Sequence, residues 1–390
     1  MDTVVLKFGG SSLSDDNKLN IVSDRIIGFK NNFKNVIVVV SAQGKTTNKL
    51  INEALNISKM PNERELDSLL SVGEQISATK LSILLNEKGY NSISLTGWQA
   101  GIKTNNVFQN AKIEEIYTKR ITDELAFDKI VIVCGFQGFD DFNNITTLGR
   151  GGSDTSAVSL AYALDADKCF IFSDVDGVYS ADPKIVTSSE KLEKISFDEM
   201  QEISDAGAKV LHNRCINVGR QHNLDIIAAS TFSDNNGTSI VKTVESSFVK
   251  SIVKNDNLTR FTLYKEGSFD RKETYMIYSE LLHNNIFLER FRSLIDIEFY
   301  VKREDINKVV KILDLFGYNY TISKFVKLSV IGNGIMSDNK YLNIIVDILK
   351  ENRIEIIDVY VSSIKIELVI NEIPDEVIRF LHDTLIVNKK

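Results

Sequence analysis

The sequence predicts an α/β fold in its first part and two small α+β modules in its second. Up to about residue 232, short apolar runs rich in β-branched residues alternate with amphipathic segments of helical length, a pattern typical of a parallel sheet covered by helices. From Arg260 onward, strands and helices follow the order of a ferredoxin-like sandwich, and this order occurs twice. The chain of 390 residues is long enough for two or three domains of roughly 150 residues each.

The strands and helices of the first part are bounded by turn residues and by changes in the spacing at which apolar residues recur. Strands are expected at Thr3–Phe8, Val36–Val40, Ser92–Leu95, Lys129–Gly135, Lys168–Ser173 and Leu224–Ala228. Helices are expected at Asp15–Lys30, Thr47–Ser58, Glu65–Glu87, Lys112–Asp123, Asp154–Leu164 and Ala208–His222. Because strands and helices alternate along the chain, the expected fold is an α/β sandwich with a mainly parallel sheet.

The second part repeats a strand and helix order in two tandem units of about 65 residues. Its strands are expected at Arg260–Lys265, Leu294–Val301, Tyr318–Ser323, Val326–Ile331, Ile354–Val361 and Ser363–Ile370. Its helices are expected at Glu273–His283, Glu304–Phe316, Lys340–Asn352 and Pro374–Leu385. These units look like a pair of accessory modules.

The composition excludes several classes of protein. A formal net charge of −7 argues against general nucleic-acid binding, because that role usually shows as a basic surplus or stripe. The three cysteines are widely spaced and form no CxxC pair, so neither a disulfide framework nor a zinc site is indicated. The start MDTVVLKFGG lacks the features of a signal peptide, and no apolar run reaches the length of a membrane span. We therefore expect a cytoplasmic protein without nucleic-acid or membrane partners.

Three glycine-containing stretches fall where predicted strands end. KFGGSS follows the first strand, SAQGKTT the second, and GRGGSD comes after the strand near Val131–Val133. Such turns expose backbone N–H groups at helix N-termini, where the helix dipole also favours negative charge. A single glycine turn most often serves only the turn itself. Three at the aligned ends of neighbouring strands indicate one anion-binding cleft.

The common phosphate-binding motifs are absent. GKTT at Gly44–Thr47 resembles the end of a Walker A motif, but Val39 occupies the position of the required first glycine. No G-x-G-x-x-G follows a predicted strand, which argues against a dinucleotide-binding fold. The anion-binding cleft therefore belongs to another class.

Eight motifs between Val5 and Cys215 follow one another in the order of a known family: VLKFGGSS, VVSAQGKTTN, LLSVGEQIS, LTGWQAGIKT, GFQG, TTLGRGGSDTSA, SDVDGVYSADP and AGAKVLHNRC. Together they resemble the aspartate kinases of the amino-acid kinase superfamily. Kinases of glutamate, acetylglutamate, carbamate and UMP share the glycine turns, whereas VGEQIS, TGWQAGI and GRGGSDTSA in combination point to aspartate. The resemblance implies a three-layer amino-acid kinase sandwich.

The resemblance also implies the reaction. The γ-phosphoryl group of ATP is transferred to the β-carboxylate of L-aspartate, giving 4-phospho-L-aspartate, in the first step toward lysine, threonine and methionine. A carboxylate acceptor with a pKa of about 3.9 is already ionised at pH 7, so no general base is required. What the reaction needs is cations, backbone donors and Mg²⁺ to bring two anions together.

The matched positions supply candidate catalytic residues. Lys7 faces the phosphates from the first glycine turn, and by family match Lys209 contacts them from the other side. Asp154 is expected to orient the two lysines and to contribute to the metal shell, rather than to act as a base. No residue is assigned as a direct metal ligand.

The resemblance assigns six residues to the amino-acid substrate: Ser41, Thr47, Glu74, Phe136, Arg150 and Ser153. Arg150 and Ser153 are expected to bind a carboxylate, for which arginine offers a bidentate fork. Glu74 is expected to bind the ammonium group, although a glutamate on a long helix can also be a simple exposed charge.

The nucleotide is expected to contact two groups of residues: Lys7, Phe8, Gly9, Gly10, Lys209 and Val210 at the phosphates, and Ser173, Asp174, Tyr179, Asp182 and Pro183 around the adenosine. By composition alone, SDVDGVYSADP would be an ordinary turn rich in aspartate and glycine. Its place in the family order favours the nucleotide role.

The second half resembles the paired ACT modules that bind feedback amino acids in these kinases. The expected domains are residues 1–245 for the kinase, 246–323 for the first ACT module and 324–390 for the second, with the strand near Phe248–Val253 joining the second module. Lysine or threonine would be the effector. The first module carries EGSFDRKE where relatives show an Asp-Lys-Pro-Gly-like turn. A homodimer through the ACT modules is expected, because exposed edge strands tend to pair.

Two other functions are compatible with the glycine turns. The chain could phosphorylate a different amino acid or a carbamoyl-type acceptor, because related kinases share these turns. It could also be a catalytically silent amino-acid-binding regulator, but Lys7, Asp154 and Lys209 are all present.

Overall fold

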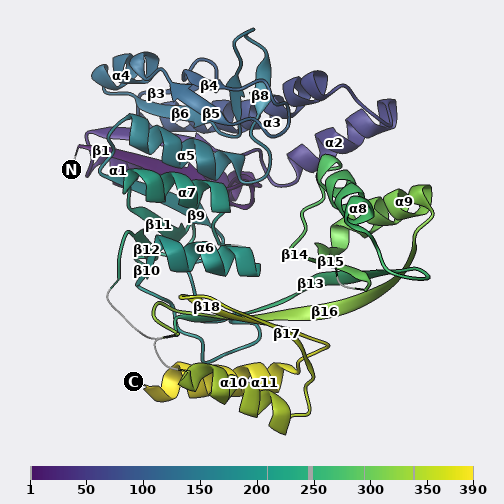
Figure 1. The fold of residues 1–390 in the computed structure, drawn as a ribbon. Helices are drawn as coiled ribbons and strands as arrows, with labels where there is room; N and C mark the ends of the chain where they lie inside the picture. The colour runs from purple at the N-terminus through teal and green to yellow at the C-terminus, as the bar shows by residue number, and fades with distance from the viewer. Residues whose placement is uncertain (1, 209, 245–248, 294, 337–338, 390) are drawn as a thin grey trace. The chain divides into compact units, whose positions relative to one another are not determined.

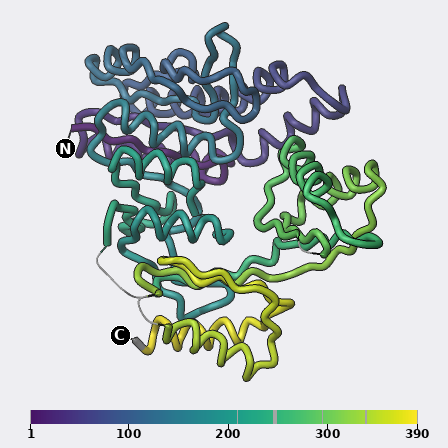
Figure 2. Tube along the Cα trace, in the orientation of Figure 1, coloured from purple at the N-terminus to yellow at the C-terminus, as the bar shows by residue number. Residues whose placement is uncertain are grey.

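The structure is a computed structural model that describes residues 2–208, 210–244, 249–293, 295–336 and 339–389 (Figures 1 and 2). The chain divides into two compact units. Unit 1 comprises Met1–Tyr179 and Lys191–Glu245, and unit 2 comprises Ser180–Glu190 and Ser246–Lys390. Unit 2 therefore includes a short piece of the N-terminal half of the chain. The assignment of residues 1–245, 246–323 and 324–390 to a kinase and two ACT modules stays a prediction.

An eight-stranded sheet forms the centre of unit 1, in the order β10-β12-β11-β9-β1-β2-β6-β3 (Figure 1). Its strands are β1 (Thr3–Phe8), β2 (Asn35–Val40), β3 (Ser92–Leu95), β6 (Ile130–Cys134), β9 (Lys168–Ser173), β10 (Lys194–Ser196), β11 (Ile226–Ser230) and β12 (Thr238–Val241). Among these neighbours, only β11 and β12 pair antiparallel. The mainly parallel sheet confirms the predicted fold class.

Helices cover both faces of this sheet. They are α1 (Asp16–Lys30), α2 (Thr46–Ile57), α3 (Glu63–Glu87), α4 (Lys119–Ala126), α5 (Gly152–Ala163), α6 (Phe197–Ala206) and α7 (Asn213–His222), with the 3-10 turn η1 (Gly10–Leu13) after β1. Leu6 and Phe8 of β1 belong to the core that includes α1 and α3. Because side chains alternate along a strand, Lys7 points to the opposite face, where α5 and α7 lie side by side (Figure 1).

A four-stranded sheet, in the order β5-β4-β7-β8, lies beside the large one. Its strands are β4 (Ile102–Thr104), β5 (Ile113–Ile116), β7 (Gln137–Phe139) and β8 (Ile145–Thr147). The predicted helix Lys112–Asp123 is wrong, because β5 occupies its first half and α4 begins only at Lys119. Ile113–Ile116 has no alternating pattern of its own and is a strand because it pairs antiparallel with β4. The predicted helix Ala208–His222 is also too long, since α7 begins at Asn213.

Unit 2 is built on a six-stranded sheet in the order β14-β15-β13-β16-β18-β17. Its strands are β13 (Ser251–Tyr264), β14 (Arg290–Ser293), β15 (Ile297–Lys302), β16 (Asn319–Ile331), β17 (Ile356–Val361) and β18 (Lys365–Ile370). Its helices are α8 (Arg271–His283), α9 (Ile306–Phe316), α10 (Lys340–Glu351) and α11 (Asp375–Leu385), with 3-10 turns η2 (Arg303–Asp305) and η3 (Val387–Lys389). No helix in the described part of the chain is both long and apolar enough to cross a bilayer.

Two hydrophobic cores lie along this sheet. β13 and β16 pair over nearly their whole length, with an irregularity between Asn255 and Leu258. On one side of that point, α8 and α9 pack on β13 and β15 around Phe261 and Phe299. On the other side, α10 and α11 pack on β16 and β18 around Leu328. The two long strands thus join two α+β halves into one sheet.

The segment Ser180–Glu190 packs within unit 2. A β-bridge between Tyr179 and Lys191 brings its two ends together. Ser180 Oγ lies 2.8 Å from His382 Nε2 in the buried side of α11, and the Ser180 carbonyl accepts from Ile252 N at 2.8 Å. Arg379 Nε donates to the Ile185 carbonyl at 2.8 Å. A piece of chain that follows β9 of the large sheet is therefore held by α11 and β13.

Candidate active site

Lys7 and Asp154 form an ion pair where β1 ends and α5 begins. The Lys7 ammonium lies 2.5 Å from Asp154 Oδ1, and the two side chains are only 10% and 14% exposed. Gly9 lies beside this ammonium group, and a Cβ at that position would sit 3.4 Å from it. The structure therefore brings together two of the three predicted catalytic residues. The third, Lys209, lies outside the described residues.

The turn Gly149–Gly152 requires its glycines. Gly149 and Gly151 have φ angles of 75° and 70°, in the left-handed region that other residues rarely adopt. A side chain on Gly151 would collide with the ring of His212, and one on Gly152 would meet Leu148 and Phe136. Gly151 is the N-cap of α5 and supplies no side-chain cap. The first N–H groups of a twelve-residue helix are thus presented at an uncapped end, where an anion is favoured.

Ser153 and Phe136 meet at the end of β6. Ser153 is buried, and a Cβ on Gly135 would lie 2.8 Å from the Ser153 Cβ, so the first turn of α5 packs directly on the strand end. Phe136 N donates to Ser156 Oγ of the same helix at 3.2 Å. Arg150, in the turn before α5, is exposed. These contacts place the Arg150–Ser153 turn beside the carboxyl end of β6.

Glu74 is a buried carboxylate near the same strand ends. Only 3% of the residue is exposed, and Oε1 accepts a hydrogen bond from Ala42 N at 2.9 Å. Oε2 is buried without a hydrogen-bond partner among the described residues. Burial raises the pKa of Glu74 to about 7, against the opposing effect of the Ala42 N–H. A buried carboxylate with one free oxygen is ready to accept a charged donor such as an ammonium group.

The first two glycine turns are in direct contact. Gly44 N donates to the Gly10 carbonyl at 2.9 Å, and Ser41 N donates to the Phe8 carbonyl at 3.1 Å. Because β2 lies between β1 and β6, Ser41 follows a strand flanked by both. Thr47 lies in the first turn of α2 and is partly exposed. The predicted acceptor residues therefore gather at the carboxyl ends of three adjacent strands.

The predicted nucleotide residues are more scattered. The side chain of Phe8 is fully buried and stacks on Phe172 with ring centroids 5.0 Å apart, so only its backbone can face a ligand. Tyr179 donates its hydroxyl to Asp176 Oδ1 at 2.7 Å, and Ser173 Oγ accepts from Val175 N at 3.1 Å. Asp174 is exposed and Val210 is partly exposed.

Asp182 and Pro183 belong to unit 2, whereas Ser173, Asp174 and Tyr179 belong to unit 1. Asp182 caps its own turn, since Oδ1 accepts from Lys184 N at 2.9 Å and its carbonyl accepts from the N–H groups of Ile185 and Val186. The predicted adenosine segment is thus divided between the two units.

Asp67 is a buried site residue that the sequence analysis did not identify. It lies on α3 seven residues before Glu74, and therefore on the same helix face, and it is fully buried. Burial raises its pKa, while N–H donors from Gln109 and Thr147 oppose the shift. The signal that could have revealed it is its spacing of seven residues, about two helical turns, from the predicted ligand Glu74.

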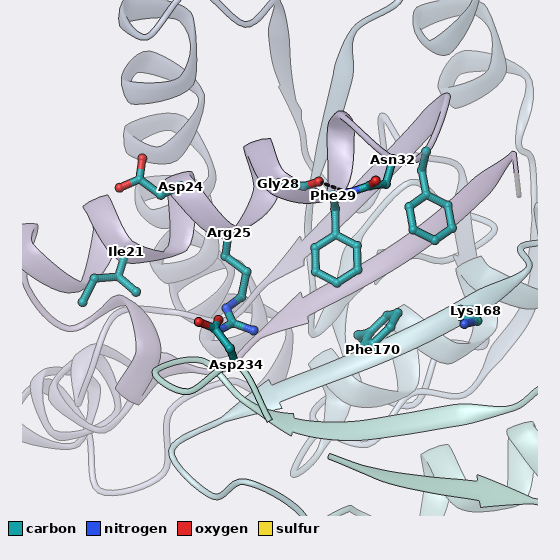
Figure 3. Close-up of a pocket in the computed structure, with 10 residues that line it drawn as sticks. Ile21, Asp24, Arg25, Gly28, Phe29, Asn32, Lys168, Phe170 and Asp234 are labelled. Carbon is teal, nitrogen blue, oxygen red and sulfur yellow. Dashed lines mark hydrogen bonds and ion pairs between the residues drawn. The ribbon is translucent and has the colours of Figure 1, made fainter. Parts of the chain in front are cut away.

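Figure 3 shows the residues that line a hollow on unit 1. It has a volume of about 760 Å³ and lies between α1 and β9, with Arg25, Phe29, Lys168 and Phe170 among its lining residues. Lys168 is the first residue of β9, and Lys7 lies near the carboxyl end of the parallel neighbour β1. This part of the hollow therefore lies at the opposite ends of the strands from Lys7. None of the predicted catalytic or ligand residues lines it.

Comparison with known proteins identifies the family. The model of the amino acid kinase family matches residues 2–230. Aspartokinase 2 of Bacillus subtilis (strain 168) is 40% identical over 407 aligned residues, which cover 100% of this chain and 99% of the relative. The aspartokinase of Bacillus sp. (strain MGA3) is 39% identical, covering 95% of this chain and 94% of the relative.

Solved structures agree on the fold. E. coli aspartokinase III, solved with aspartate and ADP, superposes with a TM-score of 0.81 at 21% identity, covering 98% of this chain and 100% of that one. The same enzyme, solved with lysine and aspartate, gives a TM-score of 0.81 at 22% identity, covering 98% and 99%. The chain therefore belongs to the amino acid kinase family, and within it to the aspartokinases. The resemblance stated from the eight motifs is confirmed.

Proposed function

We propose that the chain transfers the γ-phosphoryl group of ATP to the β-carboxylate of L-aspartate, giving 4-phospho-L-aspartate. Full-length relatives named as aspartokinases support this reaction. The structural observation that supports it best is Glu74, a buried carboxylate with one free oxygen that acts on Cys134 at the end of β6, the strand end on which the uncapped first turn of α5 packs. An amino acid with two carboxylates can offer its ammonium group to Glu74 and one of its carboxylates to the helix N-terminus.

The acceptor amino acid binds at the ends of β2 and β6. Glu74 accepts a hydrogen bond from its ammonium group through Oε2, while Arg150 and Ser153 bind a carboxylate. Ser41 and Thr47 complete the pocket beside Phe136. Because the reacting carboxylate is already ionised at neutral pH, the residues need only hold it in line with the phosphoryl group.

ATP binds with its phosphates at the first glycine turn. Lys7 neutralises charge on the transferring group, with Gly9 and Gly10 allowing the backbone to approach, and Lys209 is assigned to the same task from the other side. The ion pair with Asp154 keeps the Lys7 ammonium aimed at the α5 N-terminus. Asp154 thus acts on the phosphoryl group through the lysines and not as a base.

Magnesium enters with the nucleotide in this proposal. Mg²⁺ in such sites is held by one or two carboxylates, substrate phosphates and water. The described residues contain no cluster of three potential ligand side chains, which fits an ion held mainly by the nucleotide. Asp154, whose buried Oδ1 meets Lys7 but makes no aligned hydrogen bond, is the carboxylate assigned to its shell. When bound, the ion neutralises developing charge on the phosphoryl oxygens.

The two halves of unit 2 are proposed to be ACT modules that bind lysine or threonine and join two chains into a homodimer. A related enzyme was solved with lysine, and the six-stranded sheet of unit 2 ends in β14 and β17, two edge strands available for pairing. Light scattering at several concentrations tests the dimer, and a single-chain mass under all conditions would contradict it. EGSFDRKE, residues 266–273, stands where relatives show the effector turn, so lysine inhibition is expected to be weak or absent in the first module.

One assay tests the reaction. Hydroxylamine traps acyl phosphates, so hydroxamate formation that depends on both ATP and the acceptor reports the proposed product. We expect product with L-aspartate and little with glutamate or acetylglutamate, and the assay is repeated with lysine, threonine and both. No aspartate-dependent hydroxamate, or a preference for another acceptor, would refute the proposal.

A further inference from the structure

Asp67 is a buried carboxylate that takes no part in the proposed phosphoryl transfer. Its Oδ2 accepts a hydrogen bond from Thr147 N at 2.7 Å, and its Oδ1 accepts from Thr147 Oγ1 at 2.7 Å. Both oxygens also lie within 3.1 Å of Gln109 N. A fully buried aspartate is thus satisfied by the last residue of β8 and by a turn residue, which lie 80 and 42 positions away in the sequence.

Each of these segments supports the Arg150–Ser153 turn. Thr147 is two residues before Gly149 in the chain. Gln109 has a φ of 60°, in the left-handed region that is costly for a residue with a side chain. A Cβ at Gly149 would lie 2.6 Å from the Gln109 carbonyl oxygen, so the two backbones are in close contact. By holding Gln109 in this conformation, Asp67 also fixes the backbone against which Gly149 packs.

Arg214 holds the same segment with the opposite charge. From the first turn of α7, its guanidinium donates to the carbonyl of Leu148 and to that of Ala111 at 2.7 Å. Ala111 N in turn donates to the Thr147 carbonyl at 3.0 Å. Before the glycine turn, the N–H group of Thr147 is therefore bound by the buried anion Asp67, and the carbonyl of Leu148 is bound by the cation Arg214. Charge-assisted hydrogen bonds of this kind are stronger than neutral ones and fix geometry.

We infer that Asp67 is a positioning residue for the acceptor amino acid: together with Arg214 it fixes Thr147 and Leu148, and thereby aims Arg150 and Ser153 at the substrate carboxylate. The inference rests on the proposed role of these two residues. Because the turn holds glycines with unusual freedom, its conformation depends on supports outside it. Small displacements of binding groups have large effects on a bound reactant.

The test compares Asp67→Asn with Asp140→Asn. Asp140 is equally buried and accepts from Phe142 N, Asn144 N and Asn144 Nδ2 at 2.9, 2.8 and 3.0 Å, but it closes the β7–β8 turn of the same small sheet. We expect Asp67→Asn to raise the KM for aspartate about tenfold and the KM for ATP less than about twofold. Asp140→Asn should leave both KM values within about twofold of the original protein.

Two results would overturn the inference. One is an aspartate KM in folded Asp67→Asn that matches the original protein, and the other is an equal rise in both variants, which would indicate general loss of stability. If Asp67→Asn does not fold, Thr147→Val tests the inference instead, because it removes only the hydrogen bond from the Thr147 hydroxyl to Asp67. It should raise the aspartate KM about threefold, and an unchanged value would contradict the inference.

A further variant separates this inference from the proposed function. If Arg150→Ala leaves the aspartate KM unchanged, the proposed role of the turn in binding aspartate fails. If Arg150→Ala raises that KM while Asp67→Asn does not, only the positioning role of Asp67 fails.

Discussion

The acceptor side and the nucleotide side of the candidate site are built differently. On the acceptor side, Glu74 and Ser153 are buried, and the buried Asp67 and the partly buried Arg214 hold the backbone before the glycine turn. On the nucleotide side, Lys7 at the phosphates is buried, but the adenosine residues Asp174 and Asp182 are exposed. The hydrogen bonds of the Tyr179 hydroxyl and the Asp182 carboxylate go to residues only a few positions away in the chain.

This difference indicates which side of the site selects its ligand and which side changes conformation when its ligand binds. A pre-formed, buried pocket with paired charges discriminates strongly, because a wrong ligand leaves polar groups unsatisfied. Exposed loop residues reach their bound geometry only when the ligand orders them. We therefore expect substitutions on the acceptor side to change aspartate binding sharply, and substitutions on the nucleotide side to have smaller effects on ATP binding.

The largest effect is expected at Asp154, which lies where the two sides meet. Asp154→Asn removes the charge that orients Lys7 at 2.5 Å and should lower kcat about 100-fold, with a much smaller change in the KM for ATP. Steady-state kinetics with both substrates measure this. A variant with near-normal kcat would show that the ion pair does not serve catalysis.

Glu74→Gln is expected to have the next largest effect. Removing the charge that meets the substrate ammonium should raise the KM for aspartate about 30-fold, because hydrogen bonds to charged groups contribute about 2 kcal/mol. Glu124→Gln is the matched control, since Glu124 is also a buried glutamate but already pairs with Lys129 and with Arg120 one turn earlier on α4. Equal effects of the two substitutions would contradict the assignment of Glu74.

The raised pKa of Glu74 predicts a pH dependence of aspartate binding. Only the ionised carboxylate pairs with an ammonium group, so kcat/KM for aspartate should rise with pH up to about 7 and then level off. Glu74→Gln should lack this rise. A wild-type profile that is flat between pH 5.5 and 8 would contradict the predicted pKa of about 7.

The same pKa predicts the pH dependence of stability. Burial raises the pKa of Glu74 from 4.5 to about 7, so between these values the folded protein holds a proton that the unfolded chain has lost. The free energy of unfolding of the ligand-free protein therefore falls as pH rises through this window and is level above it. Urea unfolding at several pH values should show a smaller fall for Glu74→Gln than for the original protein. Identical slopes would show that Glu74 does not titrate in this range.

The smallest effect is expected on the nucleotide side. Ser180→Ala removes the 2.8 Å contact with His382 that holds the segment Ser180–Glu190 within unit 2. Because Asp182 lies two residues further on, we expect the KM for ATP to rise about two- to threefold, with aspartate binding unchanged. Ser188→Ala, which loses a more exposed hydrogen bond to Asp383, is the control. A tenfold or larger rise for Ser180→Ala would reverse the ranking of the two sides.

Most of the fold and part of the site could be predicted from local patterns. The strands around Lys7 and Val131–Val133 are continuous apolar runs, which only a sheet covered on both faces accommodates. The segment Ile113–Ile116 was missed because its partner β4, a strand of only three residues at Ile102–Thr104, gives no strand signal in the sequence either. Asp67 was missed for a related reason, since its role appears only when Gln109 and Thr147, 42 and 80 residues away, converge on it.

By itself, the sequence determined the alternation of strands and helices, the glycines that the Arg150–Ser153 turn requires, and the motifs that identify the family, because these properties depend on residue type and local spacing. Only the tertiary structure decided the 2.5 Å separation of Lys7 and Asp154, the unsatisfied buried oxygen of Glu74, and the division of Asp182 and Tyr179 between different units. Distances, burial and pKa shifts arise from segments far apart in the chain, and no local pattern contains them.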